Sequence, residues 1–257
     1  MKTKTKIIFS LILIFILAIA SSCNRDIPVS YSFSFYPRVC NYVYIGPTRI
    51  ITKTFEDYTY YQYWNAELDE SISIKEFLFS VAALKHNPDS LSSGNTDYYM
   101  KTLEDTDEPD TALEEQIETN YIQAGRKDMV SLPTNYPIFI EYRLTGVKDF
   151  NIKAIDAQLF DEVIGNSLNK YLKIVNYEPN FIASSINRNL LYGFTDTDKP
   201  ESIEEWLSLH PLANESMYFA FSVESDKLPL STRFVVEMET EDGVLLSDTT
   251  NMITLIK

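Results

Sequence analysis

The sequence predicts an all-β protein with a few short helices, arranged as a two-layer antiparallel β-sandwich of the immunoglobulin-like kind. Three observations lead to this fold class. Apolar and polar residues alternate with a period of two in several separate runs, which is typical of half-buried strands. Two of those runs are joined by an Asp-Gly dipeptide, a hairpin signal. The helical patterns are few and short, so the layers that bury the core must be sheets.

The strands are predicted from runs in which every second residue is aromatic or aliphatic. Most of the residues between them are polar: Ser in the first run, Glu and Arg in the second, and Ser, Glu or Thr in the later ones, as expected for a solvated face. In chain order these runs are Tyr31–Phe35, Ile138–Leu144, Phe219–Val223, Phe234–Met238 and Ile253–Leu255. The dipeptide Asp242-Gly243 after the fourth run favours a tight type I′ turn, with a return strand from Val244.

Three helices are predicted beside the strands. Thr111–Glu114 and Ser202–Glu205 both have the capping-box pattern, in which a hydroxyl residue starts the helix and a glutamate follows three positions later. A third helix is expected over 155–164, ended by Gly165. Residues 72–84 fit both a capped helix and an alternating strand, and we favour the strand because the neighbouring elements are β.

The N-terminus has the three parts of an export signal. Three lysines precede an apolar run over 7–20, and the small residues Ala20-Ser21-Ser22 lead into Cys23. A membrane-spanning helix needs roughly 20 apolar residues, so this run is too short to span and fits the core of a signal peptide. We therefore expect residues 1–22 to be a signal peptide.

The cysteine at the end of this segment changes what kind of signal it is. Ala20-Ser21-Ser22-Cys23 resembles the lipobox of bacterial lipoproteins, although Ala20 stands where a larger aliphatic residue is more usual. The resemblance implies that acyl chains are attached to Cys23 and that the chain is cut just before it. Each buried methylene contributes about 0.8 kcal/mol, so two or more chains give stable membrane anchoring. Residues 23–28 would then be a lipid-anchored tether.

The remaining body, 29–257, is long enough for one large domain or for two sub-domains divided near 130–136. Loss of residues 1–22 would leave 19 Lys and Arg against 37 Asp and Glu, a net charge of −18. Such a body repels nucleic acid and anionic lipid headgroups, and we expect neither as a partner. With Cys23 acylated, Cys40 has no disulfide partner within the chain and is expected to be a small buried hydrophobic residue.

Motifs for known chemistries are missing from the sequence. It has no G-x-S-x-G or H-E-x-x-H pattern and no glycine-rich phosphate loop, and its two histidines, His86 and His210, stand beside turn residues. The acidic runs 105–110 and 196–198 lack the glycine and distal glutamate of a calcium loop. We therefore predict no catalytic residue, metal or cofactor and no enzymatic activity, while carboxylate pairs that only the fold brings together stay open.

Aromatic residues are concentrated in one short segment. They are Tyr58, Tyr60, Tyr61, Tyr63 and Trp64. On a strand, Tyr58, Tyr60 and Trp64 would lie on one face and Tyr61 and Tyr63 on the other. Both sets can pack inside the protein, or one face can form an exposed platform for sugars or a protein interface. The segment is the candidate ligand platform of the chain.

Three tripeptides resemble the Asp-Ser/Thr acceptor of the O-glycosylation system of Bacteroidetes. They are Asp89-Ser90-Leu91, Asp110-Thr111-Ala112 and Asp248-Thr249-Thr250. The resemblance implies glycans on Ser90, Thr111 and Thr249. Ser90 is the best candidate because it lies in a polar stretch expected to be a loop, whereas a glycan on Thr111 would compete with its predicted role as a helix cap.

The two ends of the chain carry a family resemblance. The lipobox, the helix over 203–209, the strand over 217–223 and the segment from Phe234 to Thr250 together resemble the uncharacterised envelope lipoproteins of Bacteroidetes. That family has no assigned activity. It implies an outer-membrane lipoprotein held by acyl chains. An acidic cluster in the tether is associated with display on the cell surface, and the tether has only Asp26, so the periplasmic and the surface-exposed face are both open. Two functions are expected for such a body: a non-enzymatic interaction or structural module, or a glycan-binding accessory protein.

Overall fold

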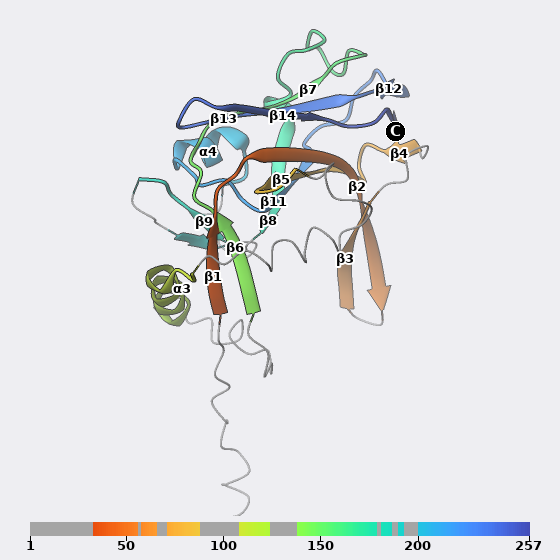
Figure 1. Ribbon diagram of the computed structural model, residues 1–257. Helices are drawn as coiled ribbons and strands as arrows, with labels where there is room; N and C mark the ends of the chain where they lie inside the picture. Colours follow the sequence, from red (N-terminus) through yellow and green to blue (C-terminus); the bar gives the residue numbers. More distant parts are fainter. Residues whose placement is uncertain are drawn as a thin grey trace, which may run out of the picture. The chain divides into compact units, whose positions relative to one another are not determined.

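The protein is mainly β, as its alternating sequence predicts (Figure 1). The computed structural model describes residues 33–55, 58–65, 71–87, 108–123, 138–178, 181–186, 190–192 and 200–257. Within this part of the chain two α-helices and one short 3-10 helix accompany fifteen strands. The all-β prediction with a few short helices is confirmed.

The bounds of the elements follow the chain order. The strands are β1 (Phe33–Arg38), β2 (Tyr42–Phe55), β3 (Tyr58–Asn65), β4 (Ser71–Ser73), β5 (Phe77–Leu84), β6 (Ile138–Arg143), β7 (Val147–Ala154), β8 (Leu172–Glu178), β9 (Phe181–Ala183), β10 (Leu190–Tyr192), β11 (Ser216–Phe221), β12 (Leu230–Thr232), β13 (Phe234–Thr240), β14 (Leu245–Thr249) and β15 (Ile253–Ile256). The helices are α3 (Thr111–Gln123), η2 (Asn169–Tyr171) and α4 (Ile203–Ser208).

The chain forms two compact units. The larger contains residues 34–114 and 139–257 and holds the sheets described below, and the smaller contains residues 1–33 and 115–138. The larger unit therefore contains residues from before and after the segment 130–136, where a boundary between two sub-domains was predicted. Its five-stranded sheet pairs β5, which precedes that segment, with β11, which follows it.

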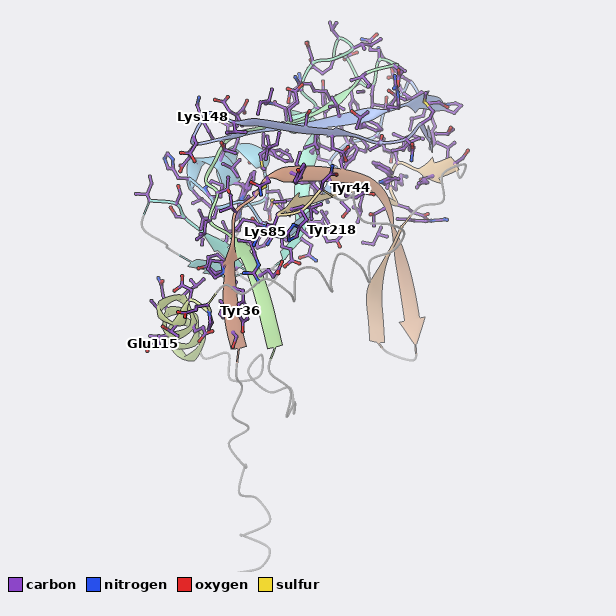
Figure 2. All side chains as sticks on the ribbon, viewed as in Figure 1. Tyr36, Tyr44, Lys85, Glu115, Lys148 and Tyr218 are labelled. Atoms are coloured by element: carbon purple, nitrogen blue, oxygen red, sulfur yellow. The ribbon has the colours of Figure 1, made fainter. Side chains whose placement is uncertain are left out.

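The largest sheet has the strand order β3-β2-β5-β11-β8, with antiparallel pairs throughout. Its inner face follows from the alternation of the sequence. Val43 and Ile45 are buried on β2, while Tyr44 between them (labelled in Figure 2) is 42% exposed. On the neighbouring strands Phe79 lies opposite Phe219, and both are completely buried. The side chains at every second position of these strands thus form the core-facing side of this sheet.

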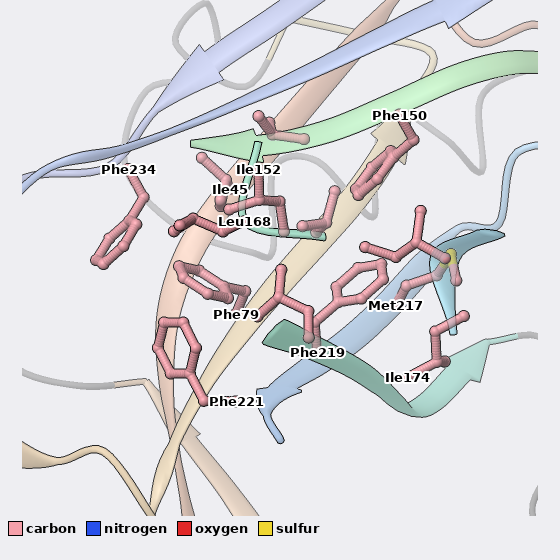
Figure 3. Close-up of a cluster of buried hydrophobic side chains, with 14 of the residues drawn as sticks. Ile45, Phe79, Phe150, Ile152, Leu168, Ile174, Met217, Phe219, Phe221 and Phe234 are labelled. Atoms are coloured by element: carbon pink, nitrogen blue, oxygen red, sulfur yellow. The ribbon is translucent and has the colours of Figure 1, made fainter. Parts of the chain in front are cut away.

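A second sheet, β14-β13-β7, packs against that inner face (Figure 3). The ring of Phe79 meets Phe234 of β13 edge-to-face, with centroids 4.8 Å apart. Phe219 stacks on Phe150 of β7 at 5.3 Å. Burying one such ring contributes about 1.5–3 kcal/mol, and aromatic pairs of this geometry add about 0.5–1.5 kcal/mol. The two sheets are therefore the layers of a sandwich whose centre is aromatic.

Three smaller sheets complete the larger unit: β12-β15-β4, β1-β6 and β9-β10. The pairing of β15 with β4 is parallel, with Leu255 opposite Ile72, so one pair departs from the antiparallel arrangement that was predicted. Residues 72–84 comprise the end of β4, a turn and β5, so the choice of strand over helix for this segment is confirmed. Immunoglobulin-like connectivity stays a prediction.

The helix α4 begins where the sequence predicts. The Ser202 hydroxyl accepts a hydrogen bond from the Glu205 N–H at 3.1 Å, and the Glu205 carboxylate accepts one from the Ser202 N–H at 3.3 Å. This reciprocal pair is a capping box, which satisfies N–H groups that the first turn leaves free. It orients a short helix whose Ile203 and Trp206 are each only 1% exposed.

The capping box predicted at Thr111 is wrong by one residue. Helix α3 begins at Thr111, and Asp110 is its N-cap: the Asp110 carboxylate accepts a hydrogen bond from the Leu113 N–H at 3.1 Å. The Asp110 carbonyl accepts another from the Glu114 N–H. Asp is at least as good an N-cap as Thr, so the preceding aspartate takes the role.

The helix predicted over 155–164 does not form. The segment consists of bends and turns, because Asp156 is held by Arg233 and Phe160 takes the left-handed backbone conformation with φ 58°. This conformation costs roughly 1–2 kcal/mol in a non-glycine residue, and the stacking of Phe160 on Tyr171 at 4.3 Å offsets it. Only Gly165 meets the expectation of a left-handed turn residue, with φ 86°.

The turn between β13 and β14 is a hairpin, as predicted, but not of type I′. A type I′ turn needs positive φ at both central residues, and in this loop only Gly243 has it, at 82°. Thr240 and Val244 close a three-residue loop through the Thr240 N–H and the Val244 carbonyl, and the Thr240 hydroxyl accepts from the Val244 N–H at 3.0 Å. The bond to the Thr240 hydroxyl stabilises this three-residue loop, which is one residue longer than the predicted type I′ turn.

Candidate functional site

The end of the five-stranded sheet extends into a two-stranded arm, formed by the outer part of β2 and by β3 (Figure 1). β2 pairs with β5 only over Tyr42–Arg49, whereas it pairs with β3 from Thr48 to Phe55. The two ladders overlap at only two residues of β2. Beyond Arg49 the sheet therefore has two described strands, and we call this outer part, 50–55 with 58–63, the β2–β3 arm.

Glu76 fixes the base of this arm. Its carboxylate forms an ion pair with Arg49, with Nη2 and Oε2 2.8 Å apart, and its backbone carbonyl accepts a hydrogen bond from the Ile50 N–H at 2.8 Å. Both side chains are partly exposed, so the ion pair itself contributes at most about 1 kcal/mol. The sequence offers no signal for this pair, because the two residues meet only through the pairing of β2 with β5.

The five aromatic residues of the predicted platform all lie on β3. Tyr58, Tyr60 and Trp64 occupy alternate positions of its backbone, and Tyr61 and Tyr63 occupy the other set. In the ladder Tyr60 lies opposite Lys53, and Trp64 lies opposite Arg49 at the base of the arm. The strand on which the prediction depends is confirmed. The ligand platform stays a prediction, because the backbone register of β3 does not decide which of these rings are exposed.

The other predicted positions are scattered. Cys23 and Ser90 lie outside the described residues, as do 105–107 and 196–198. Thr111 is the exposed first residue of α3, so its hydroxyl is not required as the cap, and Thr249 is exposed at the end of β14. His86 follows β5 in a bend, and His210 is exposed after α4 with φ 50°.

Ser185, His210 and Glu241 meet in the fold, although the sequence does not associate them. The Ser185 hydroxyl lies 2.8 Å from Glu241 Oε1 and 3.0 Å from the His210 carbonyl oxygen. Histidine contributes its backbone here, and its ring does not orient the hydroxyl as a general base would. A Cβ on Gly146 would stand 2.1 Å from Glu241 Oε2, so a larger residue at this position would displace the Glu241 side chain from its present place. The three residues therefore connect the segments that follow β9, α4 and β13, and do not form a catalytic arrangement.

A buried charged cluster connects β1, β5 and β6. Arg143 is completely buried, and its Nε donates to the Ala83 carbonyl at 2.7 Å. Glu141 accepts from both Arg143 Nη1 and Arg38 Nε at 3.3 Å. Removing one partner of a buried ion pair leaves the other charge buried without a partner, which is strongly destabilising. The cluster therefore makes the positions of β1, β5 and β6 interdependent. It was not foreseen, because arginines in alternating strands are expected on the solvated face.

The Cys40 thiol lies beside this cluster and is only 5% exposed. Burial raises the pKa of the Cys40 thiol above its ordinary value, and the charge of Arg143 lowers it to a smaller extent. Its Sγ donates a hydrogen bond to the Tyr42 carbonyl at 3.2 Å. A buried thiol with a raised pKa is a poor nucleophile, so the buried, unreactive role predicted for Cys40 agrees with its surroundings.

Asp248 occupies the inner edge of β14. One carboxylate oxygen accepts a hydrogen bond from the Ile45 N–H of β2 at 2.9 Å. Burial first, and the negative charge of Asp248 second, raise the pKa of the neighbouring Tyr44 hydroxyl. Asp248 thus satisfies a backbone donor on the stretch of β2 that β3 does not cover.

The comparison with protein families, curated proteins and solved structures gives no match for this chain. Within the described ranges no helix is long and apolar enough to cross a membrane. The same part of the chain contains no group of three or more His, Cys, Asp or Glu residues able to hold a metal ion. The candidate site is therefore chosen on its geometry, and the β2–β3 arm is that site.

Proposed function

We propose that this chain is a membrane-anchored envelope lipoprotein whose β body is a non-enzymatic interaction module, with the β2–β3 arm as its contact element. The observation that carries the proposal is the register of β2. Its first half belongs to a five-stranded sheet, while its second half pairs, among the described strands, with β3 alone. An aromatic strand that extends beyond the core-forming part of a sheet supports a role in contact with another molecule.

A photo-crosslinking amino acid at Tyr61, in the middle of β3, tests this role in cells. Crosslinks from this position to another envelope molecule are the expected result, because the arm is the proposed contact. Ser247, which is exposed on β14 of the second sheet, is the matched control and should give none. Absence of products from Tyr61, or equal products from both positions, would exclude the arm as the contact element.

Glycan binding by the same arm is the second candidate. It is supported by the alternation on β3, which assigns Tyr58, Tyr60 and Trp64 to one set of backbone positions. Aromatic rings on one face of a strand suit stacking against the apolar faces of sugars. The protein would then be an accessory to polysaccharide capture, still without catalysis.

Electrophoresis through polysaccharide-containing gels separates the two candidates. Glycan binding predicts slower migration of the wild-type protein and normal migration of Trp64→Ala. The control is Tyr42→Ala, which removes an exposed ring at the other end of β2 and should stay retarded. Equal migration of all three proteins on every polysaccharide would reject this candidate and leave protein partners.

O-glycosylation is a separate proposal for Ser90, Thr111 and Thr249. The exposure of Thr111 and Thr249 supports access for a glycosyltransferase. Mass spectrometry of peptides from the native host should find added hexose mass on these residues, and substituting Asp110 or Asp248 with Asn should remove it from the following threonine. Unmodified peptides for all three positions would contradict the proposal.

A further inference from the structure

Among the strands that the structure describes, the sheet edges are guarded, with β3 as the exception. An edge strand exposes unpaired N–H and C=O groups, and natural proteins protect such edges by short length, charged residues, proline or a covering loop. β4, β9, β10 and β12 are only three residues long. The outer edge of β7 is covered by the loop after it, through the Gly165 and Leu168 N–H groups.

The longer edges use charge. β14 carries the inward-directed Asp248, which bonds Ile45. β8 begins Leu-Lys and ends in Glu178, and its Ile174 N–H already donates to the Glu201 carbonyl at 2.7 Å. β1 and β6 each contain arginine, and β1 contains a proline as well. Each of these strands thus has at least one feature that discourages a new neighbour.

Within the described part of the chain, β3 has none of these features. It is eight residues long, its sequence is YTYYQYWN, and it contains no charged residue, proline or glycine. It stands at the end of the strand order, and β2 is its one neighbour among the described strands. Tyr, Trp and Thr are residues of high strand propensity. This strand has the composition and the place of a site for strand addition.

We infer that β3 pairs antiparallel with β3 of a second copy of this chain, which joins two five-stranded sheets into one across a two-fold axis. The inference rests on the proposed role of the arm as contact element and names the partner. With Tyr61 on the axis, Tyr60 lies opposite Gln62 of the second copy, and Tyr58 lies opposite Trp64. No opposed position within β3 carries a charge, so no like charges meet.

The charge of the whole chain sets the conditions for this pairing. Its formal net charge, −15 for the whole sequence and −18 after loss of residues 1–22, makes two copies repel each other, whereas the paired β3 strands are neutral. Salt shortens the range of that repulsion, to about 8 Å at physiological ionic strength and about 3 Å at 1 M. Association through β3 is therefore expected to strengthen as salt is added, opposite to an interface built on ion pairs.

Light scattering on the full chain, purified from its host in detergent, measures the pairing. The wild type should have twice the protein mass of one chain, and the fraction of dimer should rise with salt. Tyr61→Lys and Tyr61→Glu should each have the mass of a single chain, because like charges then oppose each other. An equimolar mixture of the two variants should return to twice that mass, which a folding defect would not allow.

The control is Leu245→Lys, which puts the same charge on an exposed position of β14, the edge of the other sheet, and should leave the dimer unchanged. A wild type of single-chain mass at all salt concentrations, or a mixture that stays monomeric, overturns the inference. If crosslinks from Tyr61 then reach a different envelope protein, the proposed function stands and only the identity of the partner is wrong.

Discussion

Single residues in this protein decide where the chain turns between the layers. Asp156 is the clearest case: both carboxylate oxygens bond Arg233, at 2.8 Å to Nη2 and 3.0 Å to Nε, and one also accepts from the Arg233 N–H. These bonds lower the pKa of Asp156 to about 2. The carboxylate fixes the start of the loop that leaves β7, where helical periodicity had predicted a helix.

The Asp156 bond gives a pH-dependent contribution to stability. Because the pKa is lowered from 3.8 to about 2 by folding, the contribution is complete above pH 4 and is lost as the pH falls through 2. Asp156→Asn should therefore lower Tm at neutral pH, and the difference from the wild type should shrink between pH 4 and 2. Calorimetric melting curves measure both.

The control for this prediction is Asp161→Asn. Asp161 lies in the same loop but is 98% exposed, with Lys227 3.9 Å away, so its Tm should match the wild type. A Tm difference for Asp156→Asn that is constant from neutral pH to pH 2 would contradict the role given to the carboxylate.

At the scale of elements, local sequence signals succeeded where the deciding interactions are local. Alternation predicted β6, β11 and β13, and the capping box predicted α4, because each depends on residues two to four positions apart. The helix over 155–164 failed because a residue about 77 positions away, Arg233, determines Asp156.

The pairing of strands could not be predicted in the same way. β4 pairs with β15, and Arg49 pairs with Glu76, only after distant segments have come together. The same limit applies to the candidate site. The aromatic strand was visible in the sequence, but the fact that β3 lies at a sheet edge depends on where β5 stops pairing with β2.

The capping box of α4 gives a prediction at this scale. Ser202→Ala removes the acceptor for the Glu205 N–H and should lower the free energy of unfolding by about 1 kcal/mol. The matched control is Ser208→Ala at the other end of the helix, whose exposed hydroxyl donates to the Glu205 carbonyl and takes no part in the capping box. Urea unfolding compares the two variants, and an equal loss in both would contradict the capping role.

At the scale of the whole molecule, one aromatic core holds two sheets together. Phe79 is central to it, because its ring contacts Phe77 and Phe221 of its own sheet and Phe234 of the other. Only the larger unit contains this core, and the arm extends from one of its layers. The buried core and the proposed contact therefore lie in different parts of the sheet: the core is built around β5 and β11, and the proposed contact is the part where β2 pairs with β3.

Truncation of this core tests the two-layer packing. Phe79→Ala should lower the free energy of unfolding by about 3–5 kcal/mol. The substitution leaves a cavity between the two sheets, and the surrounding side chains can fill it only in part. Val163→Ala, at a side chain 67% exposed, should change it by less than about 0.5 kcal/mol. Urea denaturation measures both, and a loss below about 1 kcal/mol for Phe79→Ala would contradict the stacked sheets.

The proposed lipoprotein is held at a membrane by acyl chains on Cys23. Metabolic labelling of host cells with an alkyne fatty acid, followed by capture of the protein, tests this most directly. The wild-type protein should carry the label and Cys23→Ala should not, while Cys40→Ala, which changes the buried thiol, should be labelled like the wild type. An unlabelled wild type, or a Cys23→Ala protein that keeps its label, would contradict the lipoprotein assignment.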